Sequence, residues 1–398
     1  MILLNFLTED AKLILLCKYY WELKVNHDFA HSVKDIAQAC SLKSSEIPKI
    51  AQQYCAAYAE SIRCPNCEAN YQYKTRDDFK QLLRSRITTQ VCDDCFQKEK
   101  SLRRAQEQLK LEQKAAIIRS HFSLDERPLI DVGAISFEDT VYFISLVRFG
   151  ANEDFSLIKP FRSVPELFSP SKTLDSEILR QLYQHGIISP HPDSSLDSFQ
   201  ICEDDSVRFF PEQVKWMLPR EQNSNDPRKI VQELERFFRN KLWCEHWHDA
   251  ALNLWKKIAL QESFQYLEVV LSEHGFSLTP GEKTNLVFSN LLEEYSVAQM
   301  YNFIWRAAKD AASFYLRKPV NKQHAANTIV SSIQRQAERA RSENWQVKPY
   351  RRDFRCPQSI VSQVLFNTAL QIGEEGFTLP PIIIDLVKSD AGDLGEDQ

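Results

Sequence analysis

The chain has 398 residues, is 43% apolar and carries a net charge of −5 at pH 7. It is too long for one ordinary domain, so we expect about two to four domains. Only 9 glycines occur in a chain rich in Leu, Ala, Gln, Glu and Lys, which favours helices over sandwiches or barrels. The expected fold class is therefore mainly α and multidomain.

The first residues are apolar but lack the basic region of a signal peptide. No apolar run approaches the roughly 20 residues that a membrane span needs. The 10 cysteines include two close pairs, which are typical of thiolate ligands in a reducing compartment rather than of a disulfide framework. We therefore expect a cytoplasmic protein that does not contact a membrane.

Residues 1–61 predict a helix-turn-helix domain. The expected elements are a helix at 9–25, a short helix at 32–40, a turn at 41–43 and a second helix at 45–54 capped by Ser44. The spacing of the last three resembles a helix-turn-helix, whose second helix would offer Lys49 and Gln52 to DNA. The alternative is a compact helical bundle that binds protein, since this pattern also occurs there.

Residues 62–96 contain two Cys-x2-Cys pairs separated by 24 residues, Cys64 with Cys67 and Cys92 with Cys95. The pattern resembles a zinc ribbon, with short strands expected at 71–74 and 87–91. Four thiolates complete a tetrahedron, so we expect one structural Zn²⁺ with no position open for catalysis. The alternatives are chance pairing of cysteines and a redox Cys-x-x-Cys pair, although the latter would need only one pair.

A charged stretch at 97–122 without Gly or Pro predicts a connector helix. Residues 123–225 then resemble a winged helix. Its expected elements are helices at 137–149 and 176–185 and wing strands at 198–202 and 207–210. Residues 125–228 contain 10 basic and 18 acidic side chains, and the wing turn itself is acidic. Phosphate would be repelled there, so we expect this unit to contact a protein partner.

Residues 226–389 predict a helical domain, followed by a disordered acidic tail at 390–398. Strong amphipathic segments are expected at 285–294, 298–316 and 323–344. Within this domain Cys244 and His248 are spaced as an i, i+4 pair that could share a metal ion. The alternative is a partly buried amphipathic helix.

The segment 306–355 has 12 basic and 4 acidic residues, with Trp345 and Tyr350 interleaved. Arginines neutralise phosphates, and aromatic rings stack on the bases of single strands or RNA. The candidate nucleic-acid contacts here are Arg335, Arg339, Arg351, Arg352 and Arg355. Alternatively, these arginines pair with acidic residues of the middle region and hold domains together.

Arg317 and His324 stand at the junction of two expected helices. Their Arg-x6-His spacing resembles the Arg-x4–6-His signature of HEPN-type ribonucleases. In that family, paired subunits use His for proton transfer at the ribose 2′-hydroxyl and Arg to stabilise charge on the phosphate. The resemblance implies a metal-independent ribonuclease with Arg317 and His324 as catalytic residues. A helix junction with a polar capping run explains the same residues.

No phosphate-binding loop, dinucleotide fingerprint, nucleophile elbow or zinc-protease motif is present in the sequence. The module set is common, by analogy, among bacterial regulatory, mobile-element and phage-defence proteins. We therefore expect a zinc-stabilised nucleic-acid-binding or adaptor protein, which is compatible with a homo-oligomer. The alternatives are a HEPN-like ribonuclease effector and a structural subunit of a larger assembly.

Overall fold

The computed structural model describes residues 2–85, 90–221, 226–240, 243 and 245–381. These residues are mainly helical, as expected, and the chain divides into unit 1 (Met1–Gln113) and unit 2 (Lys114–Gln398). Among the described helices none has the length and apolarity to cross a bilayer. The acidic tail expected at 390–398 lies outside the described residues.

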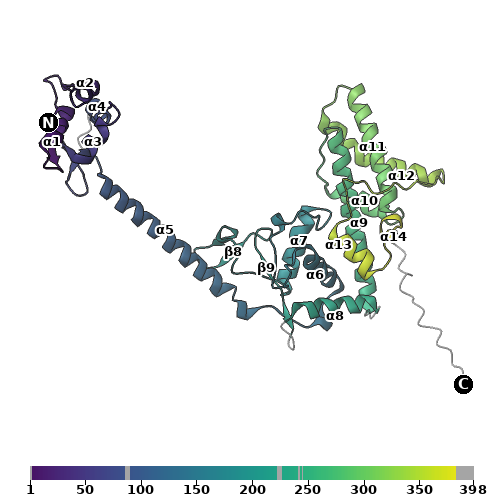
Figure 1. The fold of residues 1–398 in the computed structure, drawn as a ribbon. Helices are drawn as coiled ribbons and strands as arrows, with labels where there is room; N and C mark the ends of the chain where they lie inside the picture. Colours follow the sequence, from purple (N-terminus) through teal and green to yellow (C-terminus); the bar gives the residue numbers. More distant parts are fainter. Residues whose placement is uncertain (1, 86–89, 222–225, 241–242, 244, 382–398) are drawn as a thin grey trace. The chain divides into compact units, whose positions relative to one another are not determined.

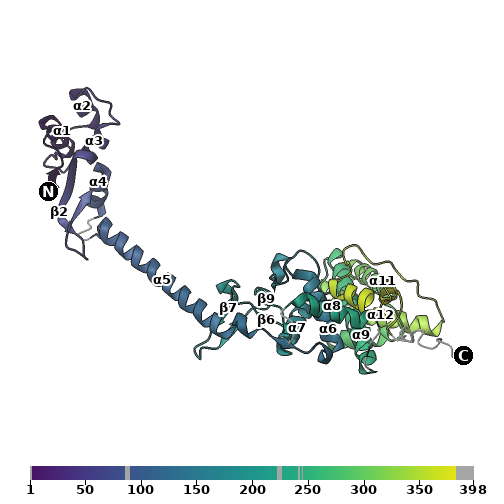
Figure 2. The same cartoon turned by 60° about the horizontal axis from the view of Figure 1, so that its bottom comes forward.

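Unit 1 combines an antiparallel sheet with short helices. Its elements are β1 (Ile2–Phe6), α1 (Ala11–Trp21), α2 (Val33–Ala39), α3 (Ile47–Tyr54), β2 (Cys55–Arg63), β3 (Asn70–Tyr73) and α4 (Arg76–Ser85). The strand order is β1-β2-β3, and α1 and α3 lie beside β2 (Figure 2). One hydrophobic core joins the helices to the sheet, with Trp21, Ile47 and Tyr73 among its members.

The expected helices of unit 1 are confirmed, with shorter bounds for the first. A capping box explains the start of α2, because Ser32 accepts from the Asp35 amide and Asp35 accepts from the Ser32 amide, each at 3.2 Å. The prediction that Ser44 caps the next helix is wrong. That helix starts at Ile47, and Glu46 at its cap position makes no side-chain bond to it.

Strands β1 and β2 were not expected from the sequence. β2 continues directly from α3, and it crosses the boundary between residues 61 and 62 that separated two expected domains. The two modules therefore share one sheet and one core.

Helix α5 (Asp93–His121) confirms the continuous helix expected at 97–122. Every side chain from residue 96 to residue 113 is exposed, so this stretch is solvated on all sides. The division between unit 1 and unit 2 falls within α5 (Figure 1).

The first part of unit 2 mixes helices with very short strands. Its helices are η1 (Leu124–Glu126), η2 (Val132–Ala134), α6 (Phe137–Gly150), η3 (Phe161–Ser163), α7 (Lys172–Gln184) and η4 (Leu196–Ser198). Its strands are β4 (Leu129–Ile130), β5 (Leu157–Ile158), β6 (Ser189–Pro190), β7 (Phe199–Ile201), β8 (Val207–Phe209), β9 (Trp216–Met217) and β10 (Arg220–Glu221). The helices expected at 137–149 and 176–185 and the hairpin of β7 with β8 are confirmed. Strand β9 lies between β5 and β6, a pairing that the sequence did not indicate.

The second part of unit 2 is helical, as expected. It consists of α8 (Pro227–Arg239), α9 (Glu245–Glu273), α10 (Glu282–Leu292), α11 (Val297–Arg317), α12 (Lys322–Ser342), α13 (Ile360–Gln363), a π-helix (Val364–Ala369) and α14 (Glu375–Thr378). α11 packs against both α9 and α12 (Figures 1 and 2). One continuous core runs from Ile118 to Phe377, so the expected winged-helix and helical domains are packed as one body.

Candidate metal centre and nucleic-acid interface

The four cysteines of the paired motifs meet in unit 1. Cys64 follows β2, Cys67 lies in the turn before β3, and Cys92 and Cys95 lie at the start of α5. Their Sγ atoms all lie within 4.8 Å of one another, and the Sγ atoms of Cys67 and Cys92 are 3.6 Å apart. A tetrahedral Zn²⁺ with Zn–S bonds of about 2.3 Å would hold its sulfurs roughly 3.8 Å apart. The cluster can therefore hold a metal ion, and its dimensions fit zinc.

Backbone amides point at the sulfurs of this cluster. The amide of Cys92 donates to Cys64 Sγ at 3.4 Å, and the amide of Cys95 donates to Cys92 Sγ at 3.4 Å. The Cys92 amide is the main reason that the pKa of Cys64 is lowered to about 6. At Cys64 this bond favours the thiolate form, which is the form that binds a metal.

The chain between the two cysteine pairs departs from a simple ribbon. β3 confirms the strand expected at 71–74, while residues 87–89 of the other expected strand lie outside the described residues. Helix α4 occupies part of the insert instead, and the amide of Gln90 donates to the Arg63 carbonyl at 3.3 Å. The sequence contains a signal for this helix, because the apolar residues Phe79 and Leu82 are spaced by three. The structure buries both of them.

The two candidate DNA contacts of α3 differ in their surroundings. Lys49 is exposed and makes no ion pair with the described residues. The Gln52 side chain is also exposed, but its amide donates to the Lys74 carbonyl at 2.8 Å and so ties α3 to the end of β3.

A cationic and aromatic surface lies on α11 of unit 2. Lys309 Nζ is 3.9 Å from the ring centroid of Trp305, and the Arg306 guanidinium is 4.5 Å from that of Trp345. The rings of Trp305 and Tyr350 meet edge to face at 6.0 Å. The structure thus brings the expected aromatic residues together with Arg306 and Lys309 of the basic segment, and with Trp305, which the sequence did not indicate.

Residues 345–351, here called the strap, are fixed along α11 by backbone bonds. The Tyr350 amide donates to the Ala298 carbonyl at 2.8 Å, and the Asn302 side chain donates to the Lys348 carbonyl at 2.9 Å. Gln299 donates to the Val347 carbonyl at 3.2 Å. The non-helical strap is therefore held as a defined surface.

Two of the predicted phosphate contacts are engaged in ion pairs within the protein, Arg352 with a buried partner and Arg355 at the surface. Arg352 makes a bidentate pair with Glu262, at 3.0 and 3.1 Å, and Glu262 is only 1% exposed. Ser362 also donates to Glu262 at 2.8 Å. Arg355 pairs with Asp353 at 2.8 Å and with Glu273. These pairs join the chain after the strap to α9, and they involve none of the acidic residues between 125 and 228.

The other predicted contacts of the basic region remain at the surface. Arg351 is exposed without a described ion-pair partner, Arg335 donates to the Ser331 carbonyl at 3.3 Å, and Arg339 pairs with Glu343 at 2.8 Å. The structure places only Arg351 beside the strap aromatics.

Arg317 and His324 lie on either side of the turn between α11 and α12, and both are exposed. The Arg317 guanidinium donates to the Ser313 carbonyl at 3.2 Å, whereas the His324 ring lies 5.9 Å from that of Phe314. Neither side chain contacts the other among the interactions of the described residues. Their pairing in a catalytic site stays a prediction.

The structure does not test the metal-binding pair suggested for Cys244 and His248. Cys244 lies outside the described residues, and the ring of His248 lies 5.4 Å from that of Trp243. Within the described ranges, the four cysteines of unit 1 form the cluster of metal-ligand side chains.

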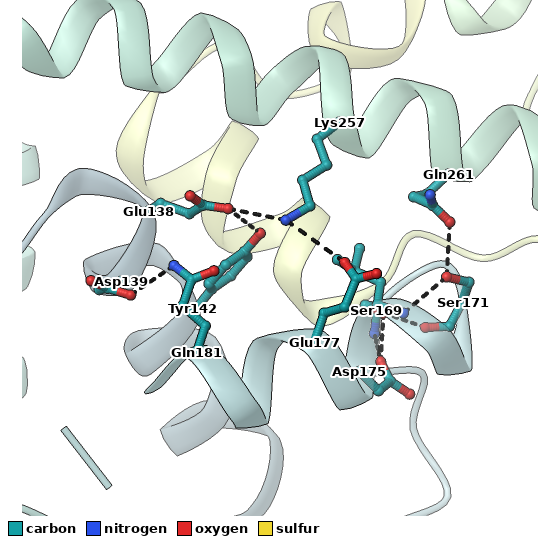
Figure 3. A network of polar contacts seen from close by, with 11 residues as sticks. Glu138, Asp139, Tyr142, Ser169, Ser171, Asp175, Glu177, Gln181, Lys257 and Gln261 are labelled. Carbon is teal, nitrogen blue, oxygen red and sulfur yellow. Dashed lines mark hydrogen bonds and ion pairs between the residues drawn. The ribbon is translucent and has the colours of Figure 1, made fainter. Parts of the chain in front are cut away.

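A polar network that the sequence did not indicate connects α6, α7 and α9 (Figure 3). Lys257 of α9 lies 3.2 Å from Glu138 of α6, which also accepts from the Tyr142 hydroxyl at 2.7 Å. At the start of α7, Ser171 donates to Gln261 at 2.8 Å and caps the helix. The polar groups of this network are hydrogen-bonded or ion-paired with one another, so the network has a structural role in holding α6, α7 and α9 together.

A cleft of about 1130 Å³ lies next to this network, with Phe149, Phe264 and Phe276 among its walls. Asp175 also lines it, and accepts from both the hydroxyl and the amide of Ser169, at 2.5 and 3.1 Å. This carboxylate in the cleft wall is thus engaged in hydrogen bonds with the residue that stands shortly before α7.

Comparison with known proteins adds no relative: no family model, no curated protein and no solved structure matches this chain.

Proposed function

We propose that the chain is a zinc-stabilised nucleic-acid-binding protein whose main contact surface is formed by α11 and the strap. The cation–aromatic cluster of Trp305, Arg306, Lys309 and Trp345 is the observation that carries the proposal. Of the five cations in α11 and the strap, we assign four to this surface, Arg306, Lys309, Lys348 and Arg351. Asp310 is the one acidic residue in the same two segments.

The chemistry of this surface favours a single strand over a duplex. Cations neutralise phosphates of either form, but only unpaired bases offer a free face to an aromatic ring. Trp305, Trp345 and Tyr350 are each partly exposed, and the rings of Trp305 and Tyr350 are in contact. Such rings beside cations are typical of sites for single-stranded DNA or RNA.

In unit 1 the metal would have a structural role. Zinc bound by Cys64, Cys67, Cys92 and Cys95 would join the end of β2 to the start of α5, and four thiolates leave no position for a reactive water. We assign α2 and α3 to a helix-turn-helix within this unit, with Lys49 as its phosphate contact. The acidic hairpin of β7 and β8 would serve a protein partner.

The test is binding of a labelled oligonucleotide to the full chain across a salt series. If four phosphates are contacted, the slope of log affinity against log salt is roughly −3 for a single strand. The Lys309→Ala/Arg351→Ala variant should weaken binding and bring the slope about 1.4 closer to zero, because two of the four cations are lost.

The matched control is Lys229→Ala/Arg236→Ala, which removes an exposed lysine and an exposed arginine from α8. It should bind as the unmodified chain does. Equal loss in both variants would refute the assignment to the strap and α11. Arg352 is avoided because its pair with buried Glu262 supports the fold. RNA that is recovered intact after the titration indicates binding alone. Cleaved RNA would instead indicate the activity that the ribonuclease prediction requires.

A further inference from the structure

The first strand of unit 1 is an open sheet edge. In the order β1-β2-β3, β1 pairs only with β2 among the described strands. Its sequence, Ile-Leu-Leu-Asn-Phe, contains no charge and no proline. Proteins usually protect a sheet edge with charges, proline or a bulge, and an unprotected apolar edge pairs readily with another strand.

The register of β1 shows which of its backbone groups are free. The Leu7 amide donates to the Tyr54 carbonyl at 2.8 Å, and the register places Asn5 opposite Ala56 and Leu3 opposite Tyr58. The backbone N–H and C=O groups of successive residues point to opposite sides of a strand, so those of Leu3, Asn5 and Leu7 point toward β2. The amides and carbonyls of the alternate residues 2, 4 and 6 therefore face the open edge, where no other described strand pairs with them.

An apolar groove lies beside this edge. It has a volume of about 470 Å³ and is formed by β1 and α1, with Leu4, Leu15 and Tyr19 among its walls. Leu15 is 48% exposed there. Trp21, which is 4% exposed, also lines the groove, and its indole N–H has no acceptor among the described residues.

We propose that a second copy of this chain occupies the edge and groove, through antiparallel pairing of the two β1 strands about a two-fold axis at Leu4. With residues 2, 4 and 6 facing outward, the paired strands would exchange about six backbone hydrogen bonds. The groove of each copy would receive Leu15 and Tyr19 from the α1 helix of the other.

Charge complementarity favours a second copy over an unrelated strand. Lys18 of α1 and Glu22, the residue directly after this helix, both line the groove. A two-fold axis sets the two α1 helices antiparallel, so the Lys18 ammonium of each copy faces the Glu22 carboxylate of the other. Glu22 uses its Oε2 for His31, at 3.1 Å, and keeps its second oxygen for this contact. A two-fold interface of this kind is self-complementary and closes at two copies.

The experiment is sedimentation velocity of the full chain over a concentration series, comparing Leu15→Glu with Leu83→Glu. Leu83 of α4 is also 48% exposed but does not line the groove. The unmodified chain and Leu83→Glu should form the same dimer. Leu15→Glu should weaken it by about 100-fold or more, because each dimer loses two leucine contacts.

A second variant, Leu4→Pro, removes an edge amide without breaking a bond to β2, and it should also yield monomers. Circular dichroism melts show whether each variant remains folded. A chain that is monomeric at about 100 μM, where a micromolar dimer would be complete, would overturn the proposal. So would a dimer that both Leu15→Glu and Leu4→Pro leave intact.

Discussion

At the residue scale, the burial of Asp175 in the wall of the large cleft should make the free energy of unfolding depend on pH. Burial raises its pKa to about 6, against the opposing effect of the bonds from Ser169. A carboxyl with a raised pKa in the folded state binds its proton more tightly there than in the unfolded chain. Its contribution to the free energy of unfolding is therefore present below about pH 4 and is lost as the pH rises through about 6.

We expect Asp175→Asn to remove this loss. The amide oxygen can still accept from Ser169, so the variant should gain roughly 1 to 3 kcal/mol relative to the unmodified chain between pH 4 and pH 7. Urea unfolding at a series of pH values measures that difference. Asp204→Asn is the control, because hydrogen bonds from Ser206 lower the pKa of Asp204 and its variant should change in the opposite direction. A difference for Asp175→Asn that does not vary with pH would contradict this account.

At the element scale, the starts of α2 and α3 predict different responses to the same substitution. Ser32→Ala removes the capping box of α2 and should lower the free energy of unfolding of unit 1 by about 1 kcal/mol. Ser44→Ala removes a serine that makes no capping bond and should change it little. Thermal melts of both variants measure the difference, and equal effects would show that α2 is held by packing alone.

The elements also show what the sequence could predict. Long amphipathic segments such as α11 and α12 were predictable, because their apolar residues follow the helical period over many turns. β2 was not, because its Cys-Ala-Ala-Tyr-Ala start has no strand alternation and continues from a helix. The partnership of β2 with β1 depends on residues about 50 positions away, which local patterns do not encode.

The same limit applies to the candidate sites. The Cys-x2-Cys pairs bring their ligands together by local turns, so the metal cluster was predictable from spacing. Arg352 was indistinguishable in sequence from exposed Arg351, because its partner Glu262 lies 90 positions away. Likewise, Trp305 and Lys309 join the strap only through the packing of residues 345–351 on α11.

At the scale of the whole molecule, unit 1 and unit 2 have separate hydrophobic cores, and the metal cluster belongs to one of them. We therefore expect two unfolding transitions in calorimetry. Removing zinc with a chelator, or replacing Cys67 with Ser, should lower the melting temperature of the unit 1 transition, because metal binding stabilises only the folded ligand set. The unit 2 transition should stay in place.

Cys40→Ser is the control for the cysteine substitution, since Cys40 is exposed and lies outside the cluster. It should leave both transitions unchanged. A chelator that shifts neither transition, with no zinc in the purified protein, would show that the four thiols serve another purpose.

Two neighbouring residues where the strap ends, Arg351 and Arg352, have different roles. Arg352 anchors the backbone through Glu262, while Arg351 beside it projects into solvent. Selection can therefore act on the two positions separately. Substitutions at the outer position change what the protein touches without unfolding it, whereas the inner arginine and its glutamate must change together. Among descendants of this chain, the pair of Arg352 and Glu262 should persist wherever the strap keeps its conformation, whereas Arg351 should persist only where the nucleic-acid contact is kept.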